Sequence, residues 1–499
     1  MPIQEPDMRH DVLDVVFSSV SQSRTVQYIN GVQEYLRVTK TCIVPLDFAG
    51  DILGMMRFLC MKIHSQGPMR KTTLSKLVDD ISHSTALETS YGGDEDYTYF
   101  NQFTGDNLRW ESIGLFYALV ASSIVHARQI VENPELSDIV EASSSCVEIC
   151  RESGPVNEIC VLSIYQNLMA ISQIYGDKTN SLVKSGLYNH EKRAEIPPHI
   201  IELRRCLFAA SWNIDKTICA ALGRPPIIAL RSPGMFQAHN EDFWGWTISV
   251  EYCAVTWVKL RYALYEMRAR LKGIQGPIGI YSKLLILSVV NDDSLMWDSL
   301  QKQLKYSIFD TGEATRKHTR QMSLLLASIY LDYLFIKLEA YDKIGQFHSA
   351  DEQAQEMMGI ILKLSPTEEG EVALMRGYSS VVVLYGVPAA YMLLRHRASI
   401  LAAKGSDHRN IKALWGETIR KLAGFISLMG LVIERQGESL DLLRDTRDNL
   451  VSAFDAVVDR FATQYDKGET IEPLPGWDPL PAPSILTLHV ELKDDIWRI

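Results

Sequence analysis

The chain has 499 residues, of which 46% are hydrophobic and 22% charged, the composition of an ordinary globular protein. Its net charge of −11 is the wrong sign for an electrostatic DNA or RNA footprint. The N-terminus lacks the apolar stretch of a signal peptide, and the longest apolar runs, Gly114–Val125 and Leu422–Ile433, are too short to span a bilayer. We therefore expect a soluble intracellular protein, nuclear or cytoplasmic.

Helical spacing of apolar residues begins near the N-terminus and is interrupted once in the first third of the chain. The interruption is the segment 88–107, rich in Gly, Asp and Tyr, which predicts a long loop. The helices predicted around it from this spacing are 12–38, 46–65, 72–85, 109–130, 136–152 and 156–175.

The stretch Lys184–Leu230 contains the next predicted helix, from His199 to Leu222. Pro197 and Pro198 precede it and Gly223 follows it, which are the expected start and stop signals of a helix. Apolar side chains fill a little over half of its circumference, so we expect a broadly buried helix.

Asp215 falls inside the apolar arc of this helix. A buried carboxylate needs a partner, because an unpaired buried charge is costly. Arg204 stands about three turns away along the helix. Arg224, after the turn at Gly223, is the preferred partner.

The second half of the chain continues with helical spacing. A large helix is predicted from Glu241, and Gly273–Gly279 forms a break after it. Asp292 and Asp293 are expected to cap and charge the N-terminus of the helix that follows. The further predicted helices are 290–308, 314–342, 350–364, 378–404 (kinked at Gly386 and Pro388), 408–435 and 437–465.

These elements predict an all-α protein, a large irregular multi-helix array without a regular repeat. We expect an N-terminal part at 1–232 and a C-terminal part at 233–466 packed against it in one continuous domain. The proline-rich tail 467–499 is expected to be irregular, apart from a short strand at 485–492.

Two blocks carry a resemblance to a known family. Phe103–Leu119 reads FTGDNLRWESIGLFYAL, and the helix 199–222 begins with ELRR at Glu202–Arg205 and is followed by GRPP at Gly223–Pro226, with Asp215 and Lys216 between them. The blocks resemble the middle homology region of fungal transcription factors. That resemblance implies a helical regulatory domain that controls transcription, in which Asp215, Lys216, Gly223, Arg224 and Pro225 are structural motif residues.

The cysteines depart from the family pattern. A binuclear zinc cluster needs six cysteines, including C-x2-C pairs, near the N-terminus. The chain has eight scattered cysteines, none in a C-x2-C pair, at positions 42, 60, 146, 150, 160, 206, 219 and 253. We expect no zinc-cluster DNA binding, either because the cluster was lost or because it lies upstream of Met1.

Catalytic signatures are sparse. The chain contains no Walker A loop, no H-E-x-x-H and no G-x-S-x-G, and NDDSLMWDSL at Asn291 does not complete the Asp-rich motif of terpene cyclases. His239 with Asn240–Asp242 could hold a metal or perform acid–base chemistry, although acidic residues also favour a helix start. No metal and no cofactor are expected.

An aromatic segment follows His239. We predict that it lines an apolar ligand pocket, with His239 at the mouth and with Trp244, Trp246, Tyr252 and Trp257 as lining residues. The leading interpretation is a regulatory protein, for instance of a secondary-metabolite pathway, that acts through an apolar effector, a homodimer or other transcription regulators. The alternative is an enzyme, a cyclase or pericyclase acting on an apolar natural-product intermediate, with His239 and Tyr252 as catalytic residues.

Overall fold

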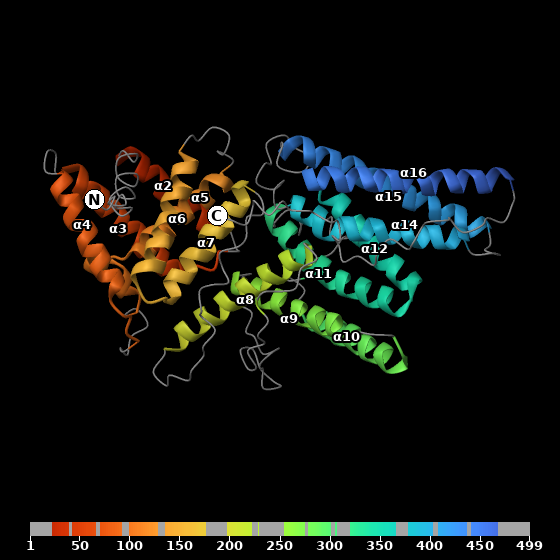
Figure 1. Ribbon diagram of the computed structural model, residues 1–499, viewed down its shortest axis with the longest axis horizontal. Helices are drawn as coiled ribbons and strands as arrows, with labels where there is room; N and C mark the ends of the chain where they lie inside the picture. Colours follow the sequence, from red (N-terminus) through yellow and green to blue (C-terminus); the bar gives the residue numbers. More distant parts are fainter. Residues whose placement is uncertain are drawn as a thin grey trace, which may run out of the picture. The chain divides into compact units, whose positions relative to one another are not determined.

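The computed structural model describes 22–38, 42–65, 70–91, 99–127, 135–175, 197–221, 228, 254–274, 278–300, 305–306, 320–365, 378–402, 408–436 and 441–467. Every regular element in these ranges is helical (Figure 1), which confirms the predicted all-α class. The chain divides into two compact units: Met1–Trp212 with Ile228–Lys259, and Asn213–Ile227 with Leu260–Ile499. The boundary predicted at residue 232, residues 12–21 of the first predicted helix, and the tail with its strand lie outside the described residues.

The first unit is organised around α5 (Trp110–His126), in which every residue from Trp110 to Val125 is buried. Gly114 permits the close approach of neighbouring helices, since a Cβ there would lie 2.9 Å from Ser163 Oγ and 3.0 Å from Cys146 Cβ. The helices that surround α5 or begin in this unit are α2 (Gln22–Val38), α3 (Leu46–Ser65), α4 (Arg70–Ala86), α6 (Leu136–Ser153), α7 (Glu158–Tyr175) and α8 (Pro198–Ala221).

The loop predicted at 88–107 contains two short 3₁₀ turns, η2 (Phe100–Phe103) and η3 (Gly105–Asn107). Gly105 adopts φ +63°, a left-handed conformation that glycine reaches without strain. Arg109 anchors the loop by donating to the carbonyl oxygens of Gln102 and Leu87, both at 2.8 Å. The described part of the segment is therefore held to the core by the buried side chain of Arg109.

In the second unit, most of the packing joins helices that are close to one another in the sequence. Its core includes α11 (Arg320–Ile344), which packs on α12 (Phe347–Lys363), and α12 packs in turn on α14 (Val387–Ala402). The remaining elements are α9 (Ala254–Gly273, whose first six residues belong to the first unit), α10 (Ile280–Ser299), η7 (Val382–Gly386), α15 (His408–Gln436) and α16 (Asp441–Lys467).

The predicted helix at 290–308 is wrong in register, because α10 begins at Ile280 and ends at Ser299. Gly279, in extended conformation, is its N-cap. Asp292 and Asp293 consequently lie in the interior of the helix and do not cap it. The spacing misled the prediction because apolar residues occur on nearly all sides of α10, so no single face marks its start.

The bend predicted at Gly386 and Pro388 corresponds to η7, a single π-helical turn that ends at Gly386. A Cβ on Gly386 would lie 2.4 Å from Cε2 of Phe425, so only glycine fits against that ring. Pro388 then stands in the first turn of α14, where its missing N–H is tolerated.

One described helix, Tyr378–Ala398, is long and apolar enough to cross a membrane by length and composition, although the sequence predicted no such stretch. Burial covers 67% of its apolar window inside the structure, and a core helix of a globular protein passes the same test. Its C-terminal part carries Arg395 and Arg397, which pair with carboxylates of neighbouring helices.

Candidate functional site

Most of the pocket residues predicted from the sequence lie outside the described residues, namely His239, Trp244, Trp246 and Tyr252. Trp257 is described; it lies half-buried in the first turn of α9. The aromatic pocket therefore stays a prediction.

Asp215 on α8 is buried, as its place in the apolar arc predicts. Its Oδ2 lies 3.6 Å from Nζ of Lys216, the next motif residue. Gly223, Arg224 and Pro225 lie outside the described residues, so the preferred pair of Asp215 with Arg224 stays a prediction. Arg204 instead binds Glu158.

The first buried polar cluster, which we call the Glu158 cluster, consists of Tyr91, Tyr99, Glu158 and Arg204. The Glu158 carboxylate is fully buried and accepts hydrogen bonds from the Tyr99 hydroxyl and from Arg204 Nε. The Tyr91 hydroxyl lies 3.2 Å from its Oε1 and also accepts from Arg204 Nη2 at 2.8 Å. Four side chains from three separate segments thus satisfy one another inside the first unit.

The electrostatics of the cluster fix its charge state. Burial, reinforced by the charge of Glu158, raises the pKa of Tyr99 and of Tyr91, so both phenols stay protonated at neutral pH. Burial alone would lower the pKa of Arg204, but the attraction of Glu158 outweighs it and the pKa is raised. Arg204 therefore stays a cation, and the two phenols stay neutral hydroxyl donors to the carboxylate.

The residue before Glu158 connects the cluster to α5. Asn157 Nδ2 donates to Oε1 of the buried Glu111 at 2.7 Å, and its Oδ1 accepts from the Cys160 backbone N–H at 2.9 Å, as an N-cap of α7 does. Burial raises the pKa of Glu111, and the hydrogen bond from Asn157 partly counters that shift.

A second buried cluster lies in the second unit, beside the π-helical turn. Asp332 on α11 accepts from Arg261 Nε at 2.9 Å and from the Tyr385 hydroxyl at 2.5 Å. Arg261 Nη2 also reaches the hydroxyls of Tyr385 at 3.2 Å and Tyr265 at 3.3 Å. Burial opposes the charge of Arg261, but Asp332 raises its pKa overall. Together these four side chains join α9, α11 and η7.

Asp293 is the exception among these buried carboxyls. It is 0% exposed, and neither carboxyl oxygen has a hydrogen-bond partner. Burial raises its pKa to about 8, against the opposing charge of Lys337 and with a small contribution from Asp332. The carboxyl is therefore largely protonated at neutral pH, the state that burial without a partner favours.

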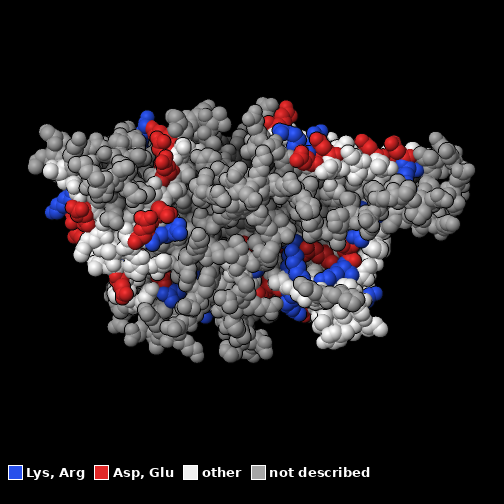
Figure 2. Space-filling model, in the orientation of Figure 1, with Lys and Arg blue, Asp and Glu red and all other residues white. Residues whose placement is uncertain are grey.

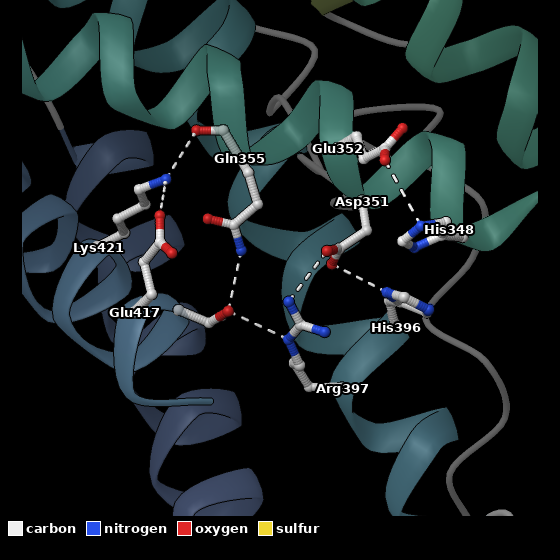
Figure 3. Close-up of polar contacts among 9 residues, drawn as sticks. His348, Asp351, Glu352, Gln355, His396, Arg397, Glu417 and Lys421 are labelled. Carbon is white, nitrogen blue, oxygen red and sulfur yellow. Dashed lines mark hydrogen bonds and ion pairs between the residues drawn. The ribbon is translucent and has the colours of Figure 1, made fainter. Parts of the chain in front are cut away.

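The third cluster joins α12, α14 and α15, and Figure 3 shows its arrangement. Asp351 lies between two consecutive side chains of α14, with Oδ1 2.9 Å from His396 Nδ1 and Oδ2 2.9 Å from Arg397 Nη2. Arg397 Nε donates in turn to Thr418 Oγ1 at 3.1 Å, and Gln355 Nε2 donates to the same oxygen at 2.9 Å. Burial lowers the pKa of Arg397 despite the attraction of Asp351.

The three buried clusters differ in which of their side chains remain available for chemistry. Glu158, Asp332 and Asp351 are each bonded to an arginine, so their charge is already used to hold helices together. Asp351 Oδ1 also lies 2.9 Å from Nδ1 of His396, a contact that is an ion pair when the imidazole is protonated. Among the described residues, no group of three His, Cys, Asp or Glu side chains could hold a metal ion.

Sequence reasoning missed all three clusters. Glu158 begins a helix, where an acidic residue is ordinarily explained by the helix dipole alone. The one usable signal was the position of Arg204 within the ELRR block, because an arginine on a broadly buried helix must find an anion.

Comparison of the chain with protein-family models, with curated proteins and with solved structures finds no match.

Proposed function

We propose that these 499 residues, in which no zinc-cluster pattern occurs, form a transcription-regulating helical protein that acts through a bound effector or a protein partner. The basis is the resemblance of two sequence blocks, Phe103–Leu119 and the ELRR helix, to the middle homology region of fungal transcription factors. Control of a secondary-metabolite pathway, and residence in the nucleus, are parts of the same proposal.

The observation that carries the proposal is that the two blocks are bonded to consecutive residues, Asn157 and Glu158, at the start of α7. The first block supplies α5, whose Glu111 is bonded to Asn157 at the start of α7. The second block supplies Arg204, which binds Glu158 at the next position. Arg204 is mostly buried and paired with a carboxylate, and Glu111 is buried with its Oε1 bonded to the Asn157 amide.

This arrangement supports a common structural role for the blocks. Residues 111 and 204 lie far apart in the sequence, and their side chains bond to two residues that stand next to each other, Asn157 and Glu158. A resemblance produced by chance composition would not require the charged residues of both blocks to converge on one short segment.

The alternative, an enzyme acting on an apolar intermediate, is favoured by one observation. Asp293 has a pKa of about 8, the range in which a carboxyl both donates and accepts a proton near neutral pH. Its side chain is fully enclosed in the described conformation, however, so a substrate would first have to open the contact of α10 with α11. The regulatory function is therefore the better supported of the two.

The proposal is tested by deleting the gene in its native host and measuring transcripts and metabolites together. A regulator changes the abundance of a set of transcripts, and the intact chain restores them. Asp293→Asn should restore them as well, since this carboxyl has no regulatory role in the proposal.

An enzyme would give a different result. Loss of one product with accumulation of its precursor, at unchanged transcript levels, would contradict the proposed function. Failure of Asp293→Asn to restore that product would then assign the chemistry to this carboxyl.

A further inference from the structure

The unpartnered carboxyl of Asp293 stands apart from the other buried acids of the second unit. It lies on the inner side of α10, it is 0% exposed, and neither of its oxygens has a hydrogen-bond partner. Asp332 and Asp351, by contrast, are each bonded to an arginine. A buried carboxyl without a partner is stable as the neutral acid, so its ionisation requires a cation close by.

Lys337 on α11 is placed to supply that cation. Trp297 stands about one turn after Asp293 on α10, and its ring is stacked on that of Tyr333 with the centroids 4.7 Å apart. Lys337 in turn stands about one turn after Tyr333 on α11. Asp293 and Lys337 are therefore each four residues from a ring of the same stacked pair, and the charge of Lys337 acts on the Asp293 carboxyl.

The Lys337 ammonium is bound to Tyr333 in this structure. Its Nζ donates to the Tyr333 hydroxyl at 2.5 Å and lies 4.4 Å from the centroid of the ring. The lysine side chain is half-buried, and its four-carbon stem is flexible. Rotation about the bonds of this stem can turn the ammonium from the hydroxyl towards a carboxylate on α10.

The other charged groups that act on Asp293 come from α11 and α9. Asp332 on α11 opposes the ionisation of Asp293 by its own negative charge. Arg261 on α9 is bonded to Asp332 at 2.9 Å, so its charge is already matched. Among the described charges that act on Asp293, Lys337 is the one whose hydrogen-bond partner is a neutral group.

The charges on α10 itself are directed to the surface. Asp292 is paired with Arg270 of α9 at 2.9 Å, and Lys283 and Asp298 are exposed. Figure 2 shows basic and acidic side chains side by side on the surface over this part of the second unit, at the lower right. Solvent and these pairings screen the surface charges, so the cation that can answer the ionisation of Asp293 comes from α11.

We propose that Lys337 exchanges partners at the contact of α10 with α11: it bonds to the Tyr333 hydroxyl while Asp293 carries its proton, and it pairs with the Asp293 carboxylate once that proton has passed to solvent. The second state adds an ion pair between α10 and α11 that the first state lacks. Because burial raises the pKa of Asp293 to about 8, the exchange takes place just above neutral pH.

This exchange is a pH-sensitive device of the second unit and does not depend on the proposed regulatory function. Most copies carry the Asp293 proton at neutral pH. Asp293→Asn imitates that state, so the variant keeps Lys337 on Tyr333 at every pH.

Tryptophan fluorescence of the full chain, followed from about pH 6 to about pH 10, measures the titration. We expect a step with its midpoint at about pH 8, because the Trp297 ring lies beside both partners of Lys337. Asp293→Asn should lack the step, and Trp297→Phe should lose it as well. Circular dichroism checks that each variant keeps its helix content.

Removal of the competing hydroxyl tests the exchange itself. Tyr333→Phe should lower the midpoint by about one pH unit, because Lys337 then gives up no hydrogen bond when it pairs with Asp293. Tyr330→Phe is the matched control, since its ring stacks on Tyr333 and its hydroxyl donates to Glu356 of α12 at 2.6 Å. The control should keep the midpoint of the wild type.

Lys337→Met removes the cation and should raise the midpoint by about 1–3 pH units. An unchanged or raised midpoint in Tyr333→Phe would overturn the proposal, and so would a step that persists in Asp293→Asn or is missing from the wild type. If Tyr333→Phe loses helix content, Lys337→Met decides in its place, and a midpoint equal to that of the wild type would overturn the proposal.

Discussion

Arg204 on α8 and Glu158 at the start of α7 form an ion pair across 46 residues of the chain. The Glu158 side chain is fully buried and that of Arg204 is 18% exposed, and two tyrosine hydroxyls complete the bonding of the carboxylate. The pair anchors the ELRR helix to α7, which packs directly on α5. Removing either partner leaves the other as an uncompensated charge in the interior of the first unit.

We expect Arg204→Ala to destabilise the protein by about 3–5 kcal/mol, the usual cost of removing one partner of a buried pair. Urea denaturation followed by circular dichroism measures the change. Arg151→Ala is the control, because Arg151 makes an exposed pair with Glu148 at 3.1 Å and should change stability by less than about 0.5 kcal/mol. Equal midpoints for the two variants would show that the Glu158 cluster does not stabilise the fold.

The pKa of Asp293 predicts a dependence of stability on pH. The folded state keeps the Asp293 proton up to about pH 8, whereas an unfolded aspartate releases it near pH 4. The folded state binds more protons than the unfolded state between these two pH values. The stabilisation of the folded state by the Asp293 proton is therefore fully present below pH 4. It falls as pH rises to about 8 and is level above that. Between pH 4 and pH 8 the free energy of unfolding falls through this group by on the order of 5 kcal/mol.

Asp293→Asn removes that titration without changing the size of the side chain. We expect the variant and the wild type to have the same melting temperature near pH 4. At pH 8 the variant should melt at the higher temperature, and the difference should grow steadily between these pH values. Melting temperatures at one-unit steps of pH measure it. A constant difference across the range would mean that Asp293 is ionised in the folded protein.

Gly386→Ala should destabilise the second unit by about 1–3 kcal/mol, because its Cβ would overlap the Phe425 ring beside the π-helical turn. Gly359→Ala on the neighbouring α12 is the matched control. No atom lies within 4 Å of a Cβ at that position, so the substitution should stabilise by about 0.5–1 kcal/mol through helix propensity. The two glycines therefore respond with opposite signs if the packing is as described.

The 499-residue chain should bind no DNA duplex at physiological salt and should contain no zinc. Its net charge is −11, and none of its cysteines forms the C-x2-C pairs of a zinc cluster. Gel-shift titration and elemental analysis of the purified protein measure both. Salt-dependent affinity in the nanomolar range would refute the argument from charge and cysteine spacing.

Helices with a proline directly before their first turn were predictable from the sequence. Pro197 and Pro198 mark the start of α8, and Leu46–Ser65 was predicted to the residue, because Pro45 precedes it and its apolar period is regular. The failure at α10 has the opposite cause. That helix is apolar on the core side and on the outer side alike, so periodicity could not locate its first turn.

The polar clusters could not be predicted, since each depends on residues that only the tertiary fold brings together. Asp332 is bonded to arginine and tyrosine side chains from 53 to 71 positions away. Glu158 and Arg204 are separated by 46 residues. No local spacing specifies which buried arginine meets which carboxylate.

The most direct test of the regulatory function is a tethered reporter. The full chain is fused to an unrelated DNA-binding domain, and transcription is measured from a promoter that carries the matching sites in a fungal host. We predict that the fusion changes reporter transcription several-fold relative to the DNA-binding domain alone, that Arg151→Ala preserves the change and that Arg204→Ala abolishes it. A reporter level equal to that of the DNA-binding domain alone, with the fusion present and folded, would contradict the account.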